Sequence, residues 1–203
     1  VVIIATGGVP NTNWIEGNGT VVSSWDVLSG MTSLNGSVFV HDLTGRNTAL
    51  AVADFLAEQG AQVTLNTQDA HIGAEAMRLE LSPFMKRFYE RGVKMTVDQE
   101  LTAAHAEDRQ TRVTVRNIHT AESSEHYVDS LVVEAGTLPN DRLFYELKEQ
   151  SANNGVVDLD LLAKGLAQPE YGAGFHLYRV GDVSGSRDIH CAMLDALRLC
   201  AQM

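Results

Sequence analysis

The chain has 203 residues, which is enough for one large domain or two small ones and for a buried core. It carries 15 Lys and Arg against 26 Asp and Glu, and the resulting formal net charge of −11 repels nucleic-acid phosphates and anionic lipid. Hydrophobic residues make up 44% and charged residues 20%, which excludes the composition of a disordered protein. We expect a folded protein that binds neither nucleic acid nor a membrane, and a homo-oligomer stays open.

The chain opens directly on a predicted strand. Residues 1–5 are a mostly β-branched run of the kind that is buried on both faces of a parallel sheet. The strand starts without an initiating Met and stops at the turn Thr6-Gly7-Gly8. Because natural chains rarely begin inside a buried strand, we expect a fragment of a longer polypeptide.

A βαβ unit is the strongest pattern that follows. Residues 38–42 form a second buried strand, residues 47–59 a helix with one apolar face, and Gly60 ends that helix before a strand at 62–66. The spacing then predicts a helix over 74–91.

That helix is expected to restart at Ser82 and Pro83, which have the residue types of an N-cap and a first helical position. Gly92 closes it before a strand at 93–97. Residues 100–130 change to two-residue alternation, which predicts an antiparallel meander.

The last third of the chain begins with a repeat of the opening sequence pattern. Residues 131–140 repeat the opening strand and its exit through Gly, Pro and Asn, and a strand at 176–180 precedes a turn and a helix at 188–201. The predicted fold class is therefore α/β, a Rossmann-like parallel sheet crossed by an antiparallel meander.

Residues 42–49 form a candidate anion site. A strand, a tight loop and a helix N-terminus bring unpaired N–H groups and the helix dipole together. The glycines of a dinucleotide-binding fingerprint would fall where this chain has Thr44, Arg46 and Ala49, with Gly45 between them. Either Arg46 contacts a phosphate, so that Arg46→Ala weakens ADP binding, or it is a solvated loop arginine.

Two further positions bear on nucleotide binding. Past the strand at 62–66, the place of a ribose-binding acid is taken by neutral residues that include Thr67, and selection of NADPH has no support. Asp182 follows Gly181 at the end of a buried strand, where a carboxylate can accept a hydrogen bond from a ligand hydroxyl and glycine permits a close approach.

Metal and disulfide chemistry have no pattern here. The 2 cysteines, Cys191 and Cys200, lie in one predicted helix too far apart to bridge, and the 7 His lack paired ligand spacing. No apolar run approaches the roughly 20 residues of a membrane span, and no signal peptide is visible. We expect a cytoplasmic protein without a metal ligand.

The ordered motifs resemble the flavoproteins with two dinucleotide-binding domains. These motifs are the exits at residues 3–11 and 133–140, the central βαβ unit with its meander, and the Gly181-Asp182 turn. Residues 21–30 and the altered loop at 42–46 more closely resemble the C-terminal part of the trimethylamine dehydrogenase-like branch of the NADH:flavin oxidoreductases. That old yellow enzyme-like group is related to 2,4-dienoyl-CoA reductase.

The resemblance implies a flavin-dependent parent oxidoreductase. Its N-terminal barrel, absent from this chain, would hold FMN and an iron–sulfur cluster, so no catalytic residue is expected here. Residues 1–36 and 131–203 would belong to a FAD-like domain and residues 37–130 to an NAD(P)/ADP-binding-like domain. The expected cofactor is FAD, or ADP or NAD(P).

The expected function is the nucleotide-binding portion of an enzyme of the amine-dehydrogenase and N-demethylase branch. The alternatives are the NADPH-binding portion of a 2,4-dienoyl-CoA reductase-like enzyme and a non-catalytic module with a vestigial site. The residues expected to bind the cofactor are Thr6, Gly7, Asp42, Thr44, Gly45, Arg46, Thr67, Gly136, Gly181, Asp182 and Ile189.

Overall fold

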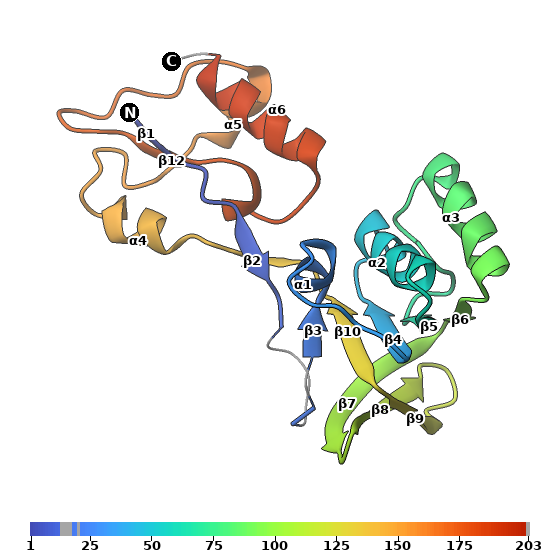
Figure 1. The fold of residues 1–203 in the computed structure, drawn as a ribbon. Coiled ribbons are helices and arrows are strands. Elements are labelled where there is room, and N and C mark those ends of the chain that lie inside the picture. The colour runs from blue at the N-terminus through green and yellow to red at the C-terminus, as the bar shows by residue number, and fades with distance from the viewer. Residues whose placement is uncertain (13–17, 20, 202–203) are drawn as a thin grey trace. The chain divides into compact units, whose positions relative to one another are not determined.

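The computed structural model describes residues 1–12, 18–19 and 21–201. The chain divides into two compact units (Figure 1). We call Pro10–Gly136 the middle unit, and Val1–Val9 together with Thr137–Met203 the terminal unit. The chain thus enters and leaves through the terminal unit.

A five-stranded sheet organises the middle unit. Its strand order is β3 (Val21–Ser23), β10 (Ser130–Glu134), β4 (Ser37–Asp42), β5 (Gln62–Thr67) and β6 (Lys94–Thr96), and every adjacent pair is parallel. Strands β10 and β4 are neighbours inside this sheet, and their register places Glu134 opposite Asp42. The predicted Rossmann-like parallel sheet is confirmed.

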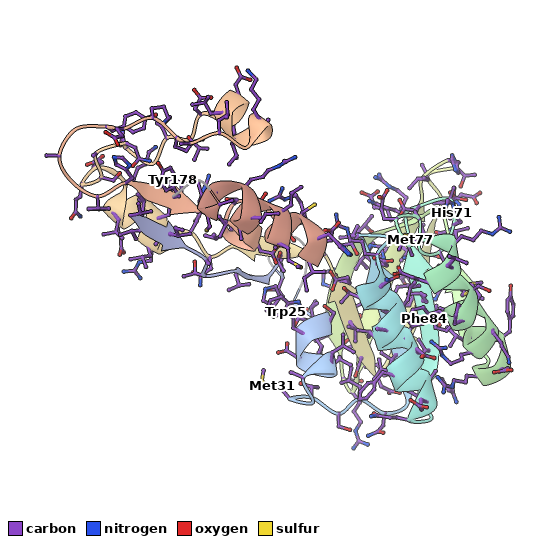
Figure 2. All side chains as sticks on the ribbon, turned by 90° about the horizontal axis from the view of Figure 1, so that it is seen from above. Trp25, Met31, His71, Met77, Phe84 and Tyr178 are labelled. Atoms are coloured by element: carbon purple, nitrogen blue, oxygen red, sulfur yellow. The ribbon has the colours of Figure 1, made fainter. Side chains whose placement is uncertain are left out.

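Among its described residues, the middle unit has the helices α1 (Ser24–Leu28), α2 (Asn47–Glu58) and α3 (Arg78–Arg91). α2 follows the prediction, and Gly60 comes just after its C-cap with a φ of 91°. Figure 2 labels Met77, the N-cap of α3, and Phe84, which packs against the core.

α3 differs from the prediction. It begins at Arg78 rather than near 74, and Pro83 lies inside it without a restart. Pro83 cannot donate to the Leu79 carbonyl one turn back. Leu79 is 90% exposed, so water can satisfy that carbonyl. The local Ser-Pro signature was therefore outweighed by the continuous packing of α3 on α2.

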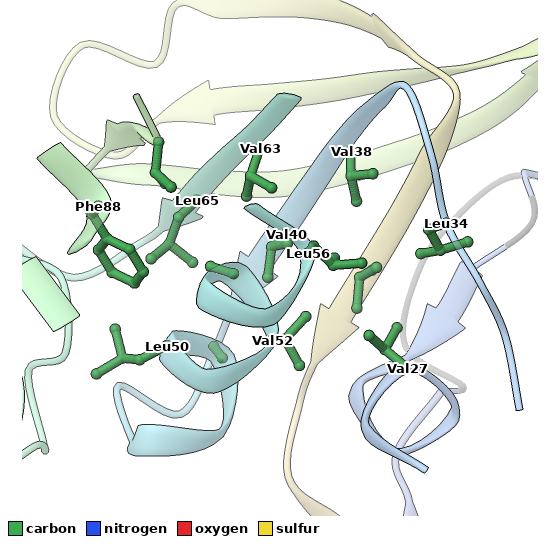
Figure 3. Packing of buried hydrophobic residues seen from close by; sticks show 14 of the residues in the cluster. Val27, Leu34, Val38, Val40, Leu50, Val52, Leu56, Val63, Leu65 and Phe88 are labelled. Carbon is green, nitrogen blue, oxygen red and sulfur yellow. The ribbon is translucent and has the colours of Figure 1, made fainter. Parts of the chain in front are cut away.

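The face of the sheet toward the helices carries the main core. Val38 and Val40 of β4 point to this face, where they meet Leu50 and Leu56 of α2 (Figure 3). Phe88 of α3 closes the same cluster. Period-two alternation in the strand and the helical period in α2 thus produce one contiguous apolar layer.

The opposite face of the sheet is covered by a meander. β7 (Gln99–Glu107), β8 (Gln110–Asn117) and β9 (Ser123–Val128) are antiparallel, as predicted. Phe39, Leu131 and Val133 point from the parallel sheet into a second core with the meander.

The terminal unit is smaller. β1 (Val2–Ile4) and β12 (Leu177–Arg179) are parallel, and four buried side chains pack around them: Ile4, Phe144, Leu177 and Val183. In the described residues β1 pairs with β12 alone, so Val2 and Ile3 are only half-buried. The expectation that β1 is buried on both faces is therefore wrong.

Four short elements complete this unit: α4 (Arg142–Lys148), α5 (Leu159–Lys164), the 3-10 turn η1 (Gly181–Val183) and α6 (Ile189–Cys200). α6 matches the predicted last helix. Asp158 caps α5 by accepting the Leu161 N–H at 3.0 Å.

The boundaries between the units differ from those expected at 36/37 and 130/131. β3 and β10 lie in the parallel sheet of the middle unit, so residues 10–36 and 131–136 belong there. The chain passes between the units at β2 (Gly8–Pro10) and β11 (Thr137–Pro139), which pair with each other. The assignment of a FAD-like and an NAD(P)/ADP-binding-like domain stays a prediction.

Among the described residues, none of the helices has both the length and the apolar character needed to span a bilayer.

Candidate functional site

A hollow of about 560 Å³ lies beside α6 in the terminal unit. We call it the α6 pocket. Its lining residues are Ala5, Gly7, Val180, Gly181, Asp182, Arg187, Asp188, Ile189, Ala192, Met193 and Ala196. It therefore brings together four of the predicted site residues: Gly7, Gly181, Asp182 and Ile189.

Two glycines form the strand side of the α6 pocket. Because β1 and β12 are parallel, Gly7 and Gly181 follow the carboxyl ends of both strands at the same edge. Their φ angles are 69° and 72°, a backbone region that favours glycine. A Cβ on Gly7 would have no atom within 4 Å, so the space above Gly7 is open to a ligand.

The first turn of α6 forms the opposite side. Asp188 is the N-cap and accepts the Cys191 N–H at 2.7 Å, which lowers the pKa of the Asp188 carboxyl. Ile189 follows at 71% exposure, and Ala192 and Met193 continue the apolar wall one turn later. The pocket therefore combines polar groups at its edge with an apolar wall.

Charged groups gather at the mouth of the α6 pocket. Asp182 is half-buried, and Arg187 donates a hydrogen bond to the Asp195 carboxylate on α6. That carboxylate raises the pKa of the Arg187 guanidinium, with smaller contributions from neighbouring groups that include Asp182. This arrangement suits a ligand that offers hydroxyl donors to Asp182.

Thr6 does not line the α6 pocket. Its hydroxyl donates to the Asn140 carbonyl at 2.6 Å. In this structure the Thr6 side chain therefore ties the β1 exit to the β11 exit.

We call the loop at residues 42–47 the elbow. Two of its backbone N–H groups are bound by the side chain of Asp42. Asp42 Oδ1 accepts the Thr44 N–H at 2.9 Å and the Gly45 N–H at 3.0 Å, and the Thr44 hydroxyl lies 3.1 Å away. Helix α2 has no side-chain cap, and the N–H groups of its first turn are not among the donors that Asp42 holds. Asp42 thus occupies the loop part of the predicted anion site and not the helix N-terminus.

The elbow is also covered from outside. Gly45 is buried, and its carbonyl accepts the Glu75 N–H at 2.9 Å. Asn47, the first residue of α2, donates to Glu80 of α3 at 2.7 Å. Arg46 is the exposed N-cap residue of α2, and its own N–H lies 3.3 Å from the Thr44 hydroxyl.

A second buried carboxylate lies beside the elbow. Glu134 accepts the Gly136 N–H at 3.0 Å and a hydrogen bond from the Ser24 hydroxyl. Burial raises the pKa of Asp42, and the nearby Glu134 adds to that rise. Gly136 has a φ of 72° and approaches the Thr44 methyl group. Two acids at this edge disfavour a phosphate beside them.

Thr67 ends β5 as a buried residue. Its hydroxyl accepts the Asp69 N–H at 3.2 Å and so forms a local turn. Asp42, Thr44, Gly45, Arg46, Thr67 and Gly136 all lie in the middle unit, as one sheet edge requires. Their role in binding stays a prediction.

A separate apolar hollow of about 610 Å³ lies by α1 in the middle unit. Its lining includes Trp25, Leu28, Met31 and Thr48, the second residue of α2. Figure 2 shows Trp25 and Met31 near opposite ends of α1.

The sequence reasoning missed Arg187, Met193 and Asp195. The helical period could have grouped Ile189, Met193 and their neighbours on one face of α6. The pairing of Arg187 with Asp195 could not be read, because one partner lies in a turn. Within residues 1–12, 18–19 and 21–201, no group of three or more His, Cys, Asp or Glu is placed to hold a metal ion.

Gly45 offers a direct test of the covered elbow. An added Cβ would lie 3.1 Å from the Glu75 nitrogen, which is backbone and cannot turn aside, and the φ of 63° strains any L side chain. Gly92 has a similar φ of 71° with nothing within 4 Å. We expect Gly45→Ala to lower the free energy of unfolding by about 1–2 kcal/mol more than Gly92→Ala, measured by urea denaturation. Equal losses would mean that the elbow is open.

The sequence matches a known protein family and several curated proteins. The sequence model of the family described as pyridine nucleotide-disulphide oxidoreductase matches residues 1–195. The probable N-methylproline demethylase of Rhizobium meliloti (strain 1021) is 37% identical over 98% of this chain and 30% of its own length. The multifunctional alkene reductase/demethylase OYE of Caballeronia cordobensis is 38% identical over the same shares, 98% and 30%.

Solved structures share the fold. The structure of histamine dehydrogenase from Rhizobium sp. 4-9 has a TM-score of 0.73 at 21% identity, over 97% of this chain and 28% of that one. The chain thus spans about 30% of the length of the curated relatives that it matches.

Proposed function

The chain belongs to the pyridine nucleotide-disulphide oxidoreductase family, and we propose that it is the nucleotide-binding region of a flavin-dependent oxidoreductase of the amine-dehydrogenase and N-demethylase branch. The family domain binds FAD and NAD(P), so an adenine-containing nucleotide is the ligand class. A bound flavin would supply the redox chemistry, and the residues of this chain would bind and orient the nucleotide.

The branch is supported by the names of the relatives. Both curated relatives described above are demethylases by name, and one of them is also an alkene reductase. Oxidation of an N-methyl amine to an iminium, which water then hydrolyses, gives up two electrons, and reduction of an alkene takes up two. A bound flavin would serve as the two-electron carrier in either case. The amine specificity would come from parts of the relatives that this chain does not span.

The α6 pocket is the observation that carries the proposal. The residues there fit a FAD or ADP moiety, because Gly7 leaves open space, Gly181 permits a close approach and Asp182 can accept from a ligand hydroxyl. The terminal unit would then be the FAD-like domain. The middle unit would be the NAD(P)/ADP-binding-like domain, with an elbow whose donors Asp42 already holds.

Calorimetric titration of the chain with FAD, ADP, NADH and NADPH tests this assignment. We expect ADP to bind at least as tightly as NADH, because the α6 pocket is assigned to the ADP moiety and the middle-unit edge would add no favourable phosphate contact for NADH. Asp182→Ala should weaken binding about tenfold or more, since a hydrogen bond to a charged group is lost. Asp160→Ala, an exposed carboxylate on α5, is the matched control.

Arg46→Ala separates the two candidate sites. Weaker ADP binding in Arg46→Ala but not in Asp182→Ala would move the site to the elbow. Saturable NADPH binding in preference to NADH and ADP would instead identify the portion of a 2,4-dienoyl-CoA reductase-like enzyme. Binding of none of the four ligands would contradict the proposal and leave a structural module.

A further inference from the structure

Asp195 lies just behind the α6 pocket without lining it. Its carboxylate accepts the Gly181 N–H at 3.3 Å and also pairs with the Arg187 guanidinium. Gly181 and Arg187 both line the pocket. A single carboxylate therefore contacts the turn that carries Asp182 and the charged residue at the pocket mouth.

The Arg187–Asp195 pair also stands between two hollows. Arg187 and Val180 line the α6 pocket and a smaller hollow of about 320 Å³, whose lining includes Asp195 and Leu199. The Asp195 side chain is 23% exposed, so this pair is screened less than a fully exposed one. The position of Arg187 at the shared wall depends on its partner on α6.

The Asp195 contact adds to the backbone hydrogen bonds of the Gly181 turn, in which the Gly181 carbonyl accepts the Ser184 N–H at 2.8 Å. Glycine has little conformational restriction, and the φ of 72° is one of several regions open to it. An acceptor on its N–H fixes the direction of the peptide plane, and this direction sets where the next residue, Asp182, presents its side chain. Helix α6 supplies that acceptor from its second turn.

We propose that Asp195 is a positioning residue for nucleotide binding, acting through the Gly181 amide and the Arg187 guanidinium. The inference rests on the proposed function of the α6 pocket. Asp195 would not contact the nucleotide itself. It would hold the Asp182 turn in the binding conformation before the ligand arrives, which lowers the ordering cost of binding.

Affinity for FAD and ADP in the full chain is the first measurement. Asp195→Ala should weaken both about tenfold, because the turn loses its anchor. Asp195→Asn should retain most of the affinity, since its amide oxygen can still accept the Gly181 N–H. Asp160→Ala again serves as the control. Unchanged or tighter binding in Asp195→Ala would overturn the inference.

A double-mutant cycle distinguishes positioning from general stability. If Asp195 acts partly through the Asp182 turn, removing it from an Asp182→Ala chain should cost clearly less than the roughly tenfold lost from the wild-type chain, with the remainder acting through Arg187. Fully additive losses would indicate a structural role that is independent of Asp182, and would contradict the proposal.

Hydrogen exchange at the Gly181 amide tests the anchor without any ligand. Asp195→Ala should speed this exchange about tenfold, and Asp195→Asn should leave it near the wild-type rate. A chain that binds neither FAD nor ADP would refute the proposed function, whereas unchanged exchange at Gly181 would refute the role of Asp195. The two failures are thus distinct.

Discussion

Phe88→Ala is expected to lower the free energy of unfolding by about 3–5 kcal/mol, measured by urea denaturation at neutral pH. Phe88 is 0% exposed and closes the core between α3 and α2. Truncation removes the ring from contact with its neighbours and leaves a cavity that close-packed side chains cannot fully fill.

Tyr89→Ala is the matched control. Tyr89 is the next residue on the same helix, and it is 73% exposed. Its loss should change the free energy of unfolding by about 0.5 kcal/mol or less. Similar losses in the two variants would mean that α3 does not pack on α2 through this face.

A pH-dependent loss of stability is expected from His41. His41 is fully buried on β4, and burial lowers its pKa from 6.5 to about 4. The Asn66 amide nitrogen lies 2.7 Å from His41 Nδ1. The Thr96 hydroxyl donates to the Asn66 carbonyl oxygen at 2.8 Å, which fixes the amide so that its N–H group faces the ring. A protonated ring would set two donors against each other.

The direction of this pH effect follows from the protonation of His41 in the folded and unfolded chains. The unfolded chain binds a proton at His41 below about pH 6.5, whereas the folded chain does so only near pH 4. Stability from this group is therefore complete above pH 6.5 and is lost as the pH falls toward 4, by at most about 3 kcal/mol. The raised pKa of Asp42 acts with the opposite sign, because that group favours the folded state at the acid end.

His41→Gln isolates the contribution. Urea denaturation at pH 7 and at pH 4.5 should show a smaller difference in the variant than in the wild type, since Asp42 is present in both. His71→Gln, at an exposed histidine, should keep the wild-type difference. An unchanged pH difference in His41→Gln would mean that His41 binds its proton alike in the folded and unfolded chains.

The βαβ unit was predictable because each signal in it is local. The apolar period of 47–59, the stop at Gly60 and the β-branched run at 62–66 each depend on neighbouring residues, and the structure agrees at all three. The continuity of α3 through Pro83 was not predictable, because the Ser82-Pro83 signature competes with packing that only the folded chain reveals.

The candidate site also contains residues that local sequence predicts and contacts that it does not. Gly181 and Asp182 were found from a strand end followed by a turn, and they line the α6 pocket with Gly7. The capture of the Thr44 and Gly45 amides by Asp42 was not foreseen, because a carboxylate at a strand end reads equally well as a ligand contact. The loop at Gly45 is also covered by Ala74 and Glu75, which are distant in sequence, and local patterns cannot reveal that contact.

The pairing of β1 with β12 has a consequence for biosynthesis. A ribosome releases β12 about 175 residues after β1, since Val2 lies opposite Leu177. The middle unit can therefore collapse before the terminal unit has both of its strands, and once folded it shortens the chain that must be closed to join them. A nascent chain stalled before Leu177 would expose Ile4 without its sheet neighbour, a state that chaperones recognise.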